Sequence, residues 1–436
     1  MLSCYNLLWK LARPFLRRHK RLGEDFSRRL LPSDWPGLAD PGGASPPYRL
    51  WLHAASGGEA YLALELLRKL SGEGAPSERR ILCTSCTRQG LEILRQARRE
   101  ETRSKKYGPG VDYLPLDEPD LMDRAVYRVF GANKGEPRVL GLLETEIWPG
   151  LLWACRKHGV SVLVLNGRMS AASLRGYRLL RAGLRRCAPA EILAVSREDL
   201  ERFRALFGGG EGDFEEPRRY SLMPNIKFDR IRPAAGGPDE EGLFPRPLLA
   251  LASVREEEEA LLLPLISRLL SAAPQCCLVL APRHLHRLEA WEKHLAGLKL
   301  DYTRRSAGLS PGPGRVLLWD SFGELDLLYR LASAVFVGGS LAPLGGQNFL
   351  EPMSQGLVPC IGPFWDNFAW AGKEIFELGL ARQARDAGEL GSLLLEQLEN
   401  PPPREEVKTR LAAYLRPRQG GTLRAAESLE RALRSG

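Results

Sequence analysis

The chain contains no uninterrupted apolar run of the roughly twenty residues that a membrane-spanning helix needs. Its first residues also lack the small-residue cleavage site of a secretory signal peptide. We find no low-complexity tract and no sequence repeat between the two halves. With 44% hydrophobic and 26% charged residues, the composition is that of an ordinary folded protein. We therefore expect a globular chain without a spanning helix.

The sequence also lacks a cysteine framework. Among its eight cysteines, Cys83 and Cys86 form a single C-x-x-C pair, and no second pair completes a zinc site. Cys276 and Cys277 lie in an apolar run and resemble core residues. These features predict reduced cysteines in a cytoplasmic environment, with no disulfide, no metal and no cofactor. A redox or zinc role for Cys83 and Cys86 is the less favoured alternative.

Acidic residues are in the minority, because 62 Lys and Arg outnumber 53 Asp and Glu and give a net charge of +9. An excess of positive charge suggests an acidic partner: a nucleic acid, an anionic membrane surface or a phosphorylated substrate. No combination of basic and aromatic residues suited to stacking bases is apparent in the sequence. We therefore expect no nucleic acid partner.

Residues 1–30 combine basic and apolar side chains in the pattern of an amphipathic helix that lies on a membrane surface. The basic members are Lys10, Arg13, Arg17, Arg18, Lys20, Arg21, Arg28 and Arg29. The apolar members are Leu7, Leu8, Trp9, Leu11, Phe15 and Leu16. This pattern predicts association with an anionic membrane surface. The alternative is a basic helix docked on the protein's own core.

Short apolar segments alternate with helical patterns along both halves of the chain. In the first half the expected strands are residues 48–55, 79–85, 111–115, 138–144, 160–166 and 191–196. In the second half they are residues 247–253, 276–282, 315–320, 334–340 and 357–363. Nearly continuous apolar strands that alternate with helices predict parallel sheets covered on both faces.

A chain of 436 residues is too long for one comfortable core, so two domains are expected. Residues 233–246, rich in proline, glycine and charge, are the predicted linker. The predicted fold class is α/β, with two doubly wound, Rossmann-like domains at residues 31–232 and 247–436. Such sheets bind ligands beyond the carboxyl ends of their strands, and we expect the site in the cleft between the domains. The helical tail after about Arg404 is expected to return to the first domain.

Residues 323–352 predict a nucleotide site. An acidic helix is followed by the apolar strand 334–340, a glycine-rich turn and a helix that opens near Asn348. Backbone N–H groups in such a turn, and the helix N-terminus after it, favour a phosphate. Glu351, one turn into the helix, is placed to bind a pair of ribose hydroxyls. The alternative is a glycine-rich turn followed by a solvated glutamate.

Other strand ends carry groups suited to acid–base or phosphate chemistry. Glu59 follows a strand and a glycine turn in HAASGGEA and is a candidate general base, or else a glutamate that only stabilises the helix start. Glu144 and Glu146 end a strand in LLETEIWP, and we expect them to point to opposite sides, so that only one of them faces the cleft. Lys227, in NIKFD, is expected near the same cleft. Arg283, in APRH, can clamp a phosphate or be an ordinary surface arginine.

Together these segments resemble the 3-deoxy-D-manno-octulosonic acid (Kdo) transferases of lipopolysaccharide synthesis. The matching motifs, in the family's order and approximate spacing, are HAASGGEA, ETEIWP, NGRMSAASLRGY, NIKFD, APRH, GELDLLY, FVGGSL and GGQNFLEP. The resemblance extends from about residue 48 to residue 370, and the basic N-terminal segment corresponds to the family's membrane-anchoring end. It implies the two-domain GT-B glycosyltransferase fold, with the active site between the domains.

The resemblance also implies roles for individual residues. Glu59 corresponds to the family's general base, and Glu144 and Lys227 correspond to groups that stabilise the transition state. The residues implied to hold the CMP part of the donor are Pro282, Arg283, Phe322, Gly323, Glu324, Asn348, Phe349, Leu350 and Glu351. The implied reaction is the inverting transfer of Kdo from CMP-Kdo to a lipid A precursor, lipid IVA, without a metal ion. The implied location is the cytoplasmic face of the cell inner membrane.

Several positions depart from the family pattern. Where the family has S-T-H-E-G-E-E, this chain has S-V-R-E-E-E-E, so that Val254 and Arg255 replace a hydroxyl and an imidazole. Leu344 and Gln347 stand in place of two histidines, and Phe349 replaces a proline. Two alternatives therefore remain open. One is a related GT-B transferase with another activated sugar or acceptor, and the other is a non-catalytic protein that binds lipopolysaccharide precursors.

Overall fold

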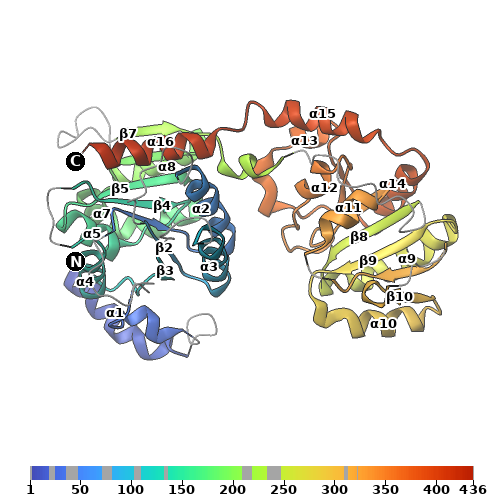
Figure 1. Cartoon of the computed structure of the whole chain (residues 1–436), viewed down its shortest axis with the longest axis horizontal. Coiled ribbons are helices and arrows are strands. Elements are labelled where there is room, and N and C mark those ends of the chain that lie inside the picture. The colour runs from blue at the N-terminus through green and yellow to red at the C-terminus, as the bar shows by residue number, and fades with distance from the viewer. Residues whose placement is uncertain are drawn as a thin grey trace. The chain divides into compact units, whose positions relative to one another are not determined.

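A computed structural model of the chain describes residues 2–18, 25–35, 48–70, 81–102, 110–131, 136–208, 219–232, 247–308, 313–321 and 323–435. The chain forms two compact units (Figure 1). Unit 1 comprises Met1–Arg230 and Arg418–Gly436, and unit 2 comprises Ile231–Pro417. The predicted linker, 233–246, and Phe322 of the predicted donor site lie outside the described residues.

Unit 1 is built on a seven-stranded parallel sheet with the strand order β3-β2-β1-β4-β5-β6-β7. The strands are β1 (Leu50–His53), β2 (Ile81–Ser85), β3 (Gly110–Tyr113), β4 (Val139–Leu143), β5 (Ser161–Gly167), β6 (Glu191–Ala194) and β7 (Arg219–Leu222). The direction of strand addition reverses between β1 and β4. Doubly wound sheets bind their ligands at this switch point.

Helices cover both faces of the unit 1 sheet. One face carries α2 (Gly57–Leu70), α3 (Arg88–Thr102) and α16 (Gly421–Arg434). The other carries α4 (Pro119–Phe130), α5 (Pro149–Lys157) and α8 (Arg197–Phe207). Along β1, Leu50 and Leu52 pack in the first of these cores, whereas Trp51 packs in the second. Because the interior strands are covered on both faces, they are largely apolar.

The C-terminal helix α16 is part of unit 1, and it packs against α2, β4 and β5. Asp229 fixes its first turn, because its carboxylate accepts hydrogen bonds from the N–H groups of Gly420 at 2.7 Å and Thr422 at 2.6 Å. Near its other end, Arg431 forms an ion pair with Glu191 at 2.9 Å. The last segment of the chain therefore completes a core formed mainly by the first.

Unit 2 is built on a second seven-stranded parallel sheet, with the order β10-β11-β9-β8-β12-β13-β14. Its strands are β8 (Leu248–Val254), β9 (Cys277–Pro282), β10 (Tyr302–Arg304), β11 (Val316–Leu318), β12 (Ala334–Val337), β13 (Cys360–Ile361) and β14 (Arg382–Gln383). The core on one face includes α9 (Glu259–Ala272), α10 (Leu288–Gly297) and α14 (Ala387–Glu399). Helix α11 (Leu325–Leu331) packs against β8 and against α12 (Leu350–Ser354). Helix α12 in turn packs against α15 (Arg404–Leu415). The switch point of this sheet lies between β8 and β12.

Helix α1 (Leu2–Leu16) contacts α4 through polar side chains. Lys10 forms an ion pair with Asp120 at 2.9 Å, and Arg13 forms one with Glu118 at 2.5 Å. Large apolar side chains of the helix stay 57% to 78% exposed; they are Leu7, Leu8, Leu11 and Phe15. The amphipathic helix therefore docks on the protein while presenting apolar side chains to solvent.

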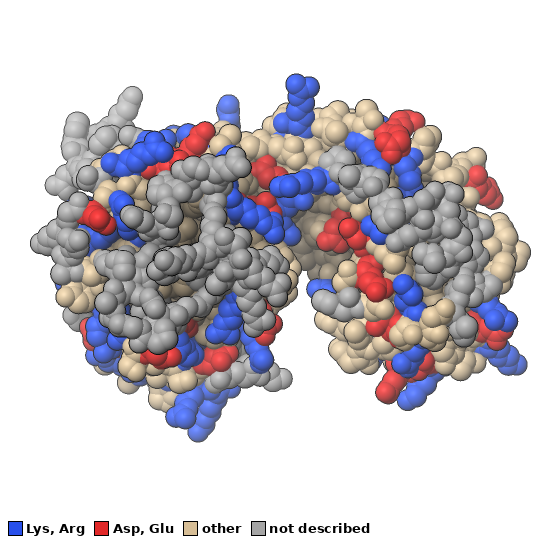
Figure 2. Space-filling view, viewed as in Figure 1, with Lys and Arg blue, Asp and Glu red and all other residues tan. Residues whose placement is uncertain are grey.

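Among the described helices, none is long and apolar enough to cross a bilayer. Basic and acidic side chains are interspersed over both units on the face drawn in Figure 2. The excess of basic residues therefore does not form one continuous block on that face.

Candidate active site

Glu59 lies at the switch point of the unit 1 sheet, in the first turn of α2 beyond the carboxyl end of β1. Its carboxylate fixes the turn between the two elements. Oε2 accepts a hydrogen bond from the backbone N–H of Ala55 at 2.7 Å, and Oε1 accepts one from the Ser56 hydroxyl at 2.9 Å. The Ser56 oxygen in turn accepts from the N–H of Glu59 at 3.4 Å. These bonds hold the partly buried carboxylate in one orientation.

Glu144 follows β4 directly and is paired with Lys227. The Nζ atom of Lys227 lies 2.6 Å from Oε1 of Glu144, and a guanidinium nitrogen of Arg168 lies 3.8 Å from the same oxygen. The Glu144 backbone is left-handed, with φ of 60°. Such a conformation costs a non-glycine residue about 1–3 kcal/mol and is typical of functional sites. Glu144 also acts electrostatically on Glu59, so all three predicted catalytic groups gather in unit 1.

The prediction that only one of Glu144 and Glu146 faces the site is wrong, because both carboxylates act on the charge of Glu59. Residues two apart in a strand share a face, so even an extended backbone would place both carboxylates on one side. Here β4 ends at Leu143, Glu144 is left-handed, and both glutamates lie in the segment that follows the strand. Glu146 is then oriented by the indole N–H of Trp148, which donates to its Oε2 at 2.7 Å.

Burial raises the pKa of Glu59 to about 7, and the negative charges of Glu146 and Glu144 add to this rise. The Ser56 hydrogen bond and the His53 ring oppose it. A carboxylate with a pKa near neutrality is ionised often enough to accept a proton and basic enough to hold it. The environment of Glu59 therefore suits a general base.

Two asparagines position the segment that carries Lys227. Buried Asn166 accepts a hydrogen bond from the backbone N–H of Ile226 at 2.8 Å, at the start of the 3-10 helix η3 (Ile226–Arg230). Asn225 accepts one from the N–H of Lys227 at 3.0 Å. Asn166 and Arg168 belong to the NGRMSAASLRGY motif, to which the sequence analysis assigned no role. The structure shows that this motif supports the Lys227–Glu144 pair.

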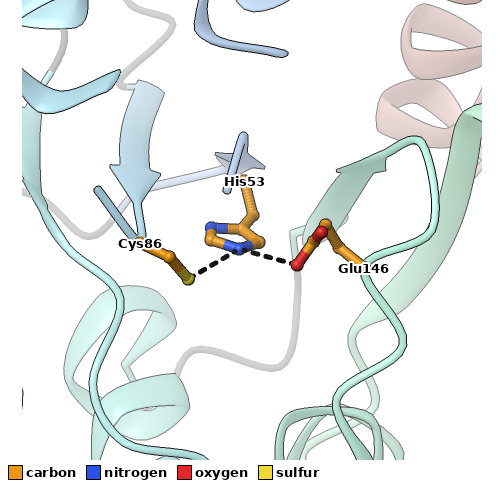
Figure 3. A group of neighbouring side chains, drawn as sticks. All are labelled: His53, Cys86 and Glu146. Atoms are coloured by element: carbon orange, nitrogen blue, oxygen red, sulfur yellow. Dashed lines mark hydrogen bonds and ion pairs between the residues drawn. The ribbon is translucent and has the colours of Figure 1, made fainter. Parts of the chain in front are cut away.

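His53, the last residue of β1, is fully buried and lies between Cys86 and Glu146 (Figure 3). Its Nε2 lies 3.7 Å from the Cys86 Sγ and 3.7 Å from Oε2 of Glu146, and its Nδ1 lies 2.9 Å from Oγ1 of Thr84. Burial disfavours the charged ring, but Cys86 and Glu146 outweigh this effect and raise the pKa of His53 to about 10. Sequence patterns do not indicate this group, because His53 ends β1 whereas Cys86 and Glu146 follow β2 and β4.

In unit 2, a buried glutamate fills the start of the glycine-rich turn. Glu258 accepts hydrogen bonds from the N–H groups of Gly339 at 2.6 Å and of Ser340 and Leu341 at 2.9 Å each. These three N–H groups are therefore not available to a phosphate, contrary to the simple prediction for this turn. Gly338 must be glycine, because a Cβ there would lie 2.6 Å from a backbone oxygen of β8.

The carboxyl ends of β8 and β9 carry positive charge. Pro282 is the buried last residue of β9, and the exposed Arg283 follows it. Arg255 follows β8. Both arginines lie near His284, and the pKa of His284 is lowered by burial and then by Arg255 and Arg283. The sequence analysis proposed Arg283 but missed Arg255 and His284, which the pairing of β8 with β9 brings to the same edge.

The segment before α11 supplies two more of the predicted donor residues. Gly323 adopts a left-handed φ of 84°, which favours glycine. Glu324 is the N-cap residue of α11, and its carboxylate lies 3.7 Å from Nε of Arg305. Because this segment follows β11 in a parallel sheet, it lies at the same carboxyl edge as Arg283.

The last four predicted donor residues are divided between surface and core. Asn348 donates a hydrogen bond to Oε1 of the exposed Glu351 at 2.8 Å, and its Oδ1 accepts from the N–H of Leu350 at 3.2 Å. The side chains of Phe349 and Leu350 are buried, and Phe349 packs in an aromatic cluster. Only the backbone of these two residues is therefore available to a ligand.

Comparison with known proteins decides the family. The family model described as "3-Deoxy-D-manno-octulosonic-acid transferase (kdotransferase)" matches residues 18–230. A 3-deoxy-D-manno-octulosonic acid transferase of Bordetella pertussis is 33% identical over 392 residues, which cover 87% of this chain and 86% of that protein. The chain belongs to the Kdo transferase family. A further Kdo transferase, from Haemophilus influenzae, is 29% identical over 347 residues, covering 76% of this chain and 74% of that protein.

Solved structures establish the fold. A glycosyltransferase from Rickettsia africae matches with a TM-score of 0.57 at 10% identity, covering 89% of this chain and 100% of that chain. A UDP-N-acetylglucosamine 2-epimerase matches with a TM-score of 0.54 at 15% identity, covering 90% and 98%. The predicted GT-B fold and the predicted membership of the Kdo transferase family are both confirmed. Membership of this family supports glycosyltransferase activity, and the roles of the individual residues stay predictions.

Proposed function

We propose that the protein is an inverting glycosyltransferase that moves Kdo from CMP-Kdo to a lipid A precursor, lipid IVA. One observation carries this proposal. Glu59, with its pKa raised to about 7, lies at the switch point of unit 1 beside the Lys227–Glu144 pair. This is the arrangement that a base-catalysed transfer to a sugar hydroxyl needs, since the base must be ionised at neutral pH and held in place.

In the proposed reaction, the Glu59 carboxylate takes the proton of an acceptor hydroxyl as that oxygen attacks the anomeric carbon of Kdo. The bond between the anomeric carbon and the CMP phosphate breaks, and CMP leaves with the electron pair. Inversion follows because the attacking oxygen and the leaving phosphate lie on opposite faces of the sugar. Lys227, held by Glu144, supplies positive charge that stabilises the transition state.

The donor phosphate is proposed to bind at the carboxyl ends of β8 and β9. Arg283 and Arg255 offer guanidinium groups that suit a phosphate, and His284 lies near both. Asn348 and Glu351 are proposed to bind the nucleoside. Since three amides of the glycine-rich turn are held by Glu258, the side-chain cations take a larger share of the phosphate charge than the turn does.

Mass analysis of the products tests this function. Purified protein incubated with CMP-Kdo and a tetraacylated lipid A precursor should convert the precursor to a species heavier by one or more Kdo residues. Because Arg255, Leu344 and Gln347 depart from the family pattern, other CMP and UDP sugars belong in the same assay. Transfer from one of these sugars, and none from CMP-Kdo, would favour the related GT-B transferase. Absence of transfer from every donor would contradict the proposal.

We further propose that α1 docks on the anionic cytoplasmic face of the inner membrane, where the lipid acceptor lies. The support is the row of exposed apolar side chains on α1, which the exposed Arg17 and Arg18 follow directly. Apolar side chains that enter the interface and basic ones that meet anionic headgroups bind such a surface together.

Changing Leu7 and Leu11 together to aspartate should weaken binding to anionic vesicles at least tenfold. Burying one leucine side chain contributes about 1.5–3 kcal/mol, and the new carboxylates add repulsion. Vesicle flotation measures the bound fraction. The matched control is Leu378→Asp, at an exposed leucine of unit 2. Equal flotation of the double variant and the unmodified protein would exclude α1 as the docking element.

A further inference from the structure

We propose that His53, Cys86 and Glu146 form a binding site for one thiophilic divalent cation, with Zn²⁺ as the best match (Figure 3). Each residue offers one ligand atom, and these three atoms all lie within 4.8 Å of one another. A thiolate, an imidazole and a carboxylate are ligands that Zn²⁺ accepts, whereas Mg²⁺ prefers oxygen alone. The proposal concerns metal binding only and does not depend on the proposed transfer reaction.

The spacing of the ligand atoms suits a tetrahedral ion. Bond lengths of about 2.3 Å to sulfur and about 2.0 Å to nitrogen place the two ligand atoms of a tetrahedral Zn²⁺ about 3.6 Å apart. The Cys86 Sγ and His53 Nε2 lie 3.7 Å apart. Oε2 of Glu146 lies 3.7 Å from the same nitrogen and is the third ligand atom. The fourth corner is left for water or a ligand.

The surroundings of His53 support a ring that binds metal through Nε2. A metal-ligating histidine usually hydrogen-bonds its other nitrogen to an acceptor, which fixes the ring and the tautomer. Here Nδ1 lies 2.9 Å from Oγ1 of Thr84. That oxygen also accepts the indole N–H of Trp51 at 2.8 Å, and its second lone pair remains for the Nδ1 proton. Binding of the ion displaces the proton that Nε2 of the charged ring carries, and Nε2 then offers its lone pair to the ion.

Neighbouring residues also hold Glu146 and Cys86 in place for metal binding. The Trp148 indole N–H donates to Glu146 and orients its carboxylate. Arg29 is buried and donates to the carbonyl of Cys86 at 2.6 Å. This bond fixes the backbone that carries the Cys86 thiol. Cys86 and Glu146 are both partly exposed, which gives an ion a path from solvent.

The C-x-x-C pair of the sequence does not form this site as a unit. Cys83 is fully buried in the core that α2 covers, whereas Cys86 packs beside the opposite core. Cys83 is therefore a matched control, since it lies on β2, three residues before Cys86, which directly follows that strand. The competing explanation for the group is a hydrogen-bond network that only orients His53, and such a network binds no metal.

Cobalt binding distinguishes the two explanations. We would titrate tag-free, reduced, full-length protein with Co²⁺ and record absorption, because a Co²⁺–thiolate bond gives a charge-transfer band that a hydrogen-bond network does not. The expected result is one equivalent of Co²⁺ per chain, displaced by Zn²⁺ and unaffected by excess Mg²⁺. Calorimetry with Zn²⁺ alone should give the same stoichiometry.

Cys86→Ser should abolish the charge-transfer band, and Glu146→Gln should weaken Zn²⁺ binding at least tenfold, because each removes one ligand. Glu146→Gln keeps an acceptor for Trp148, so circular dichroism should show an intact fold. Cys83→Ala should keep both the band and the affinity. Absence of a band in the unmodified protein, a band that survives in Cys86→Ser, or one that disappears in Cys83→Ala would overturn the site.

Discussion

Replacing Glu59 by glutamine should lower the rate of Kdo transfer by roughly 10²–10⁴-fold, the range that general-base catalysis contributes. Glutamine has nearly the same size and can still accept the Ser56 hydrogen bond, but it cannot take a proton from the acceptor hydroxyl. Initial rates with CMP-Kdo and lipid IVA measure the effect. Affinity for CMP, measured by calorimetry, should not change, because the proposed nucleotide site is built from unit 2.

The pH dependence separates a base from a residue that only shapes the turn. Glu59 must be ionised to act, so kcat/KM should rise with pH through an apparent pKa of about 7. Glu146→Gln removes one of the charges that raise this pKa, so the acidic limb should move to lower pH. Glu65→Gln, further along α2, is the matched control and should keep both the rate and the profile. A Glu59→Gln variant that retains full activity would remove the base assignment.

Replacing Arg283 by alanine should weaken CMP-Kdo binding about 10- to 100-fold. The physical reason is that a charge-assisted hydrogen bond contributes about 1.5–3 kcal/mol. The Arg283 side chain is exposed, and its substitution should leave stability within about 0.5 kcal/mol of the unmodified protein. Calorimetric titration with CMP measures the loss directly, and KM for CMP-Kdo should rise in parallel.

Arg315→Ala is the control for loss of an exposed positive charge. Arg315 is also exposed in unit 2, but it precedes β11 and so lies at the amino edge of the sheet, opposite the carboxyl edge. Arg315 forms a long ion pair with Asp301, at 3.8 Å. Equal CMP affinity of the Arg283 variant and the unmodified protein would place the phosphate elsewhere in unit 2.

The sequence predicted the interior strands and missed the short polar ones at sheet edges. All eleven expected segments contain a strand, from β1 to β13, because strands covered on both faces are nearly continuous apolar runs. The three strands that were missed, β7, β10 and β14, each lie at the edge of a sheet. These edge strands carry no such run, whereas β3, the fourth edge strand, is fully buried and was predicted.

In the candidate site, too, local sequence patterns predict some features, whereas contacts between distant parts of the chain determine others. Glu59, Glu144 and Lys227 stand at the ends of predictable elements, and they gather as expected. Glu144 and Glu146 both act on Glu59, as their two-residue spacing allows, whereas the left-handed backbone of Glu144 is indicated by no local pattern. Glu258 accepts hydrogen bonds from the glycine-rich turn, although it precedes Gly339 by 81 residues in the sequence. Such contacts depend on the order of the strands in the sheet, and local sequence patterns do not reveal that order.

The place of α16 has a consequence for synthesis on the ribosome. Unit 2 is contiguous in the chain, so it can mature as soon as Pro417 has emerged. Unit 1 begins earlier but must wait for Leu429 and its neighbours to cover β4 and β5. One face of β4 and β5 therefore stays uncovered while the whole of unit 2 is translated. Unit 2 is thus completed before unit 1, although most of unit 1 is synthesised first.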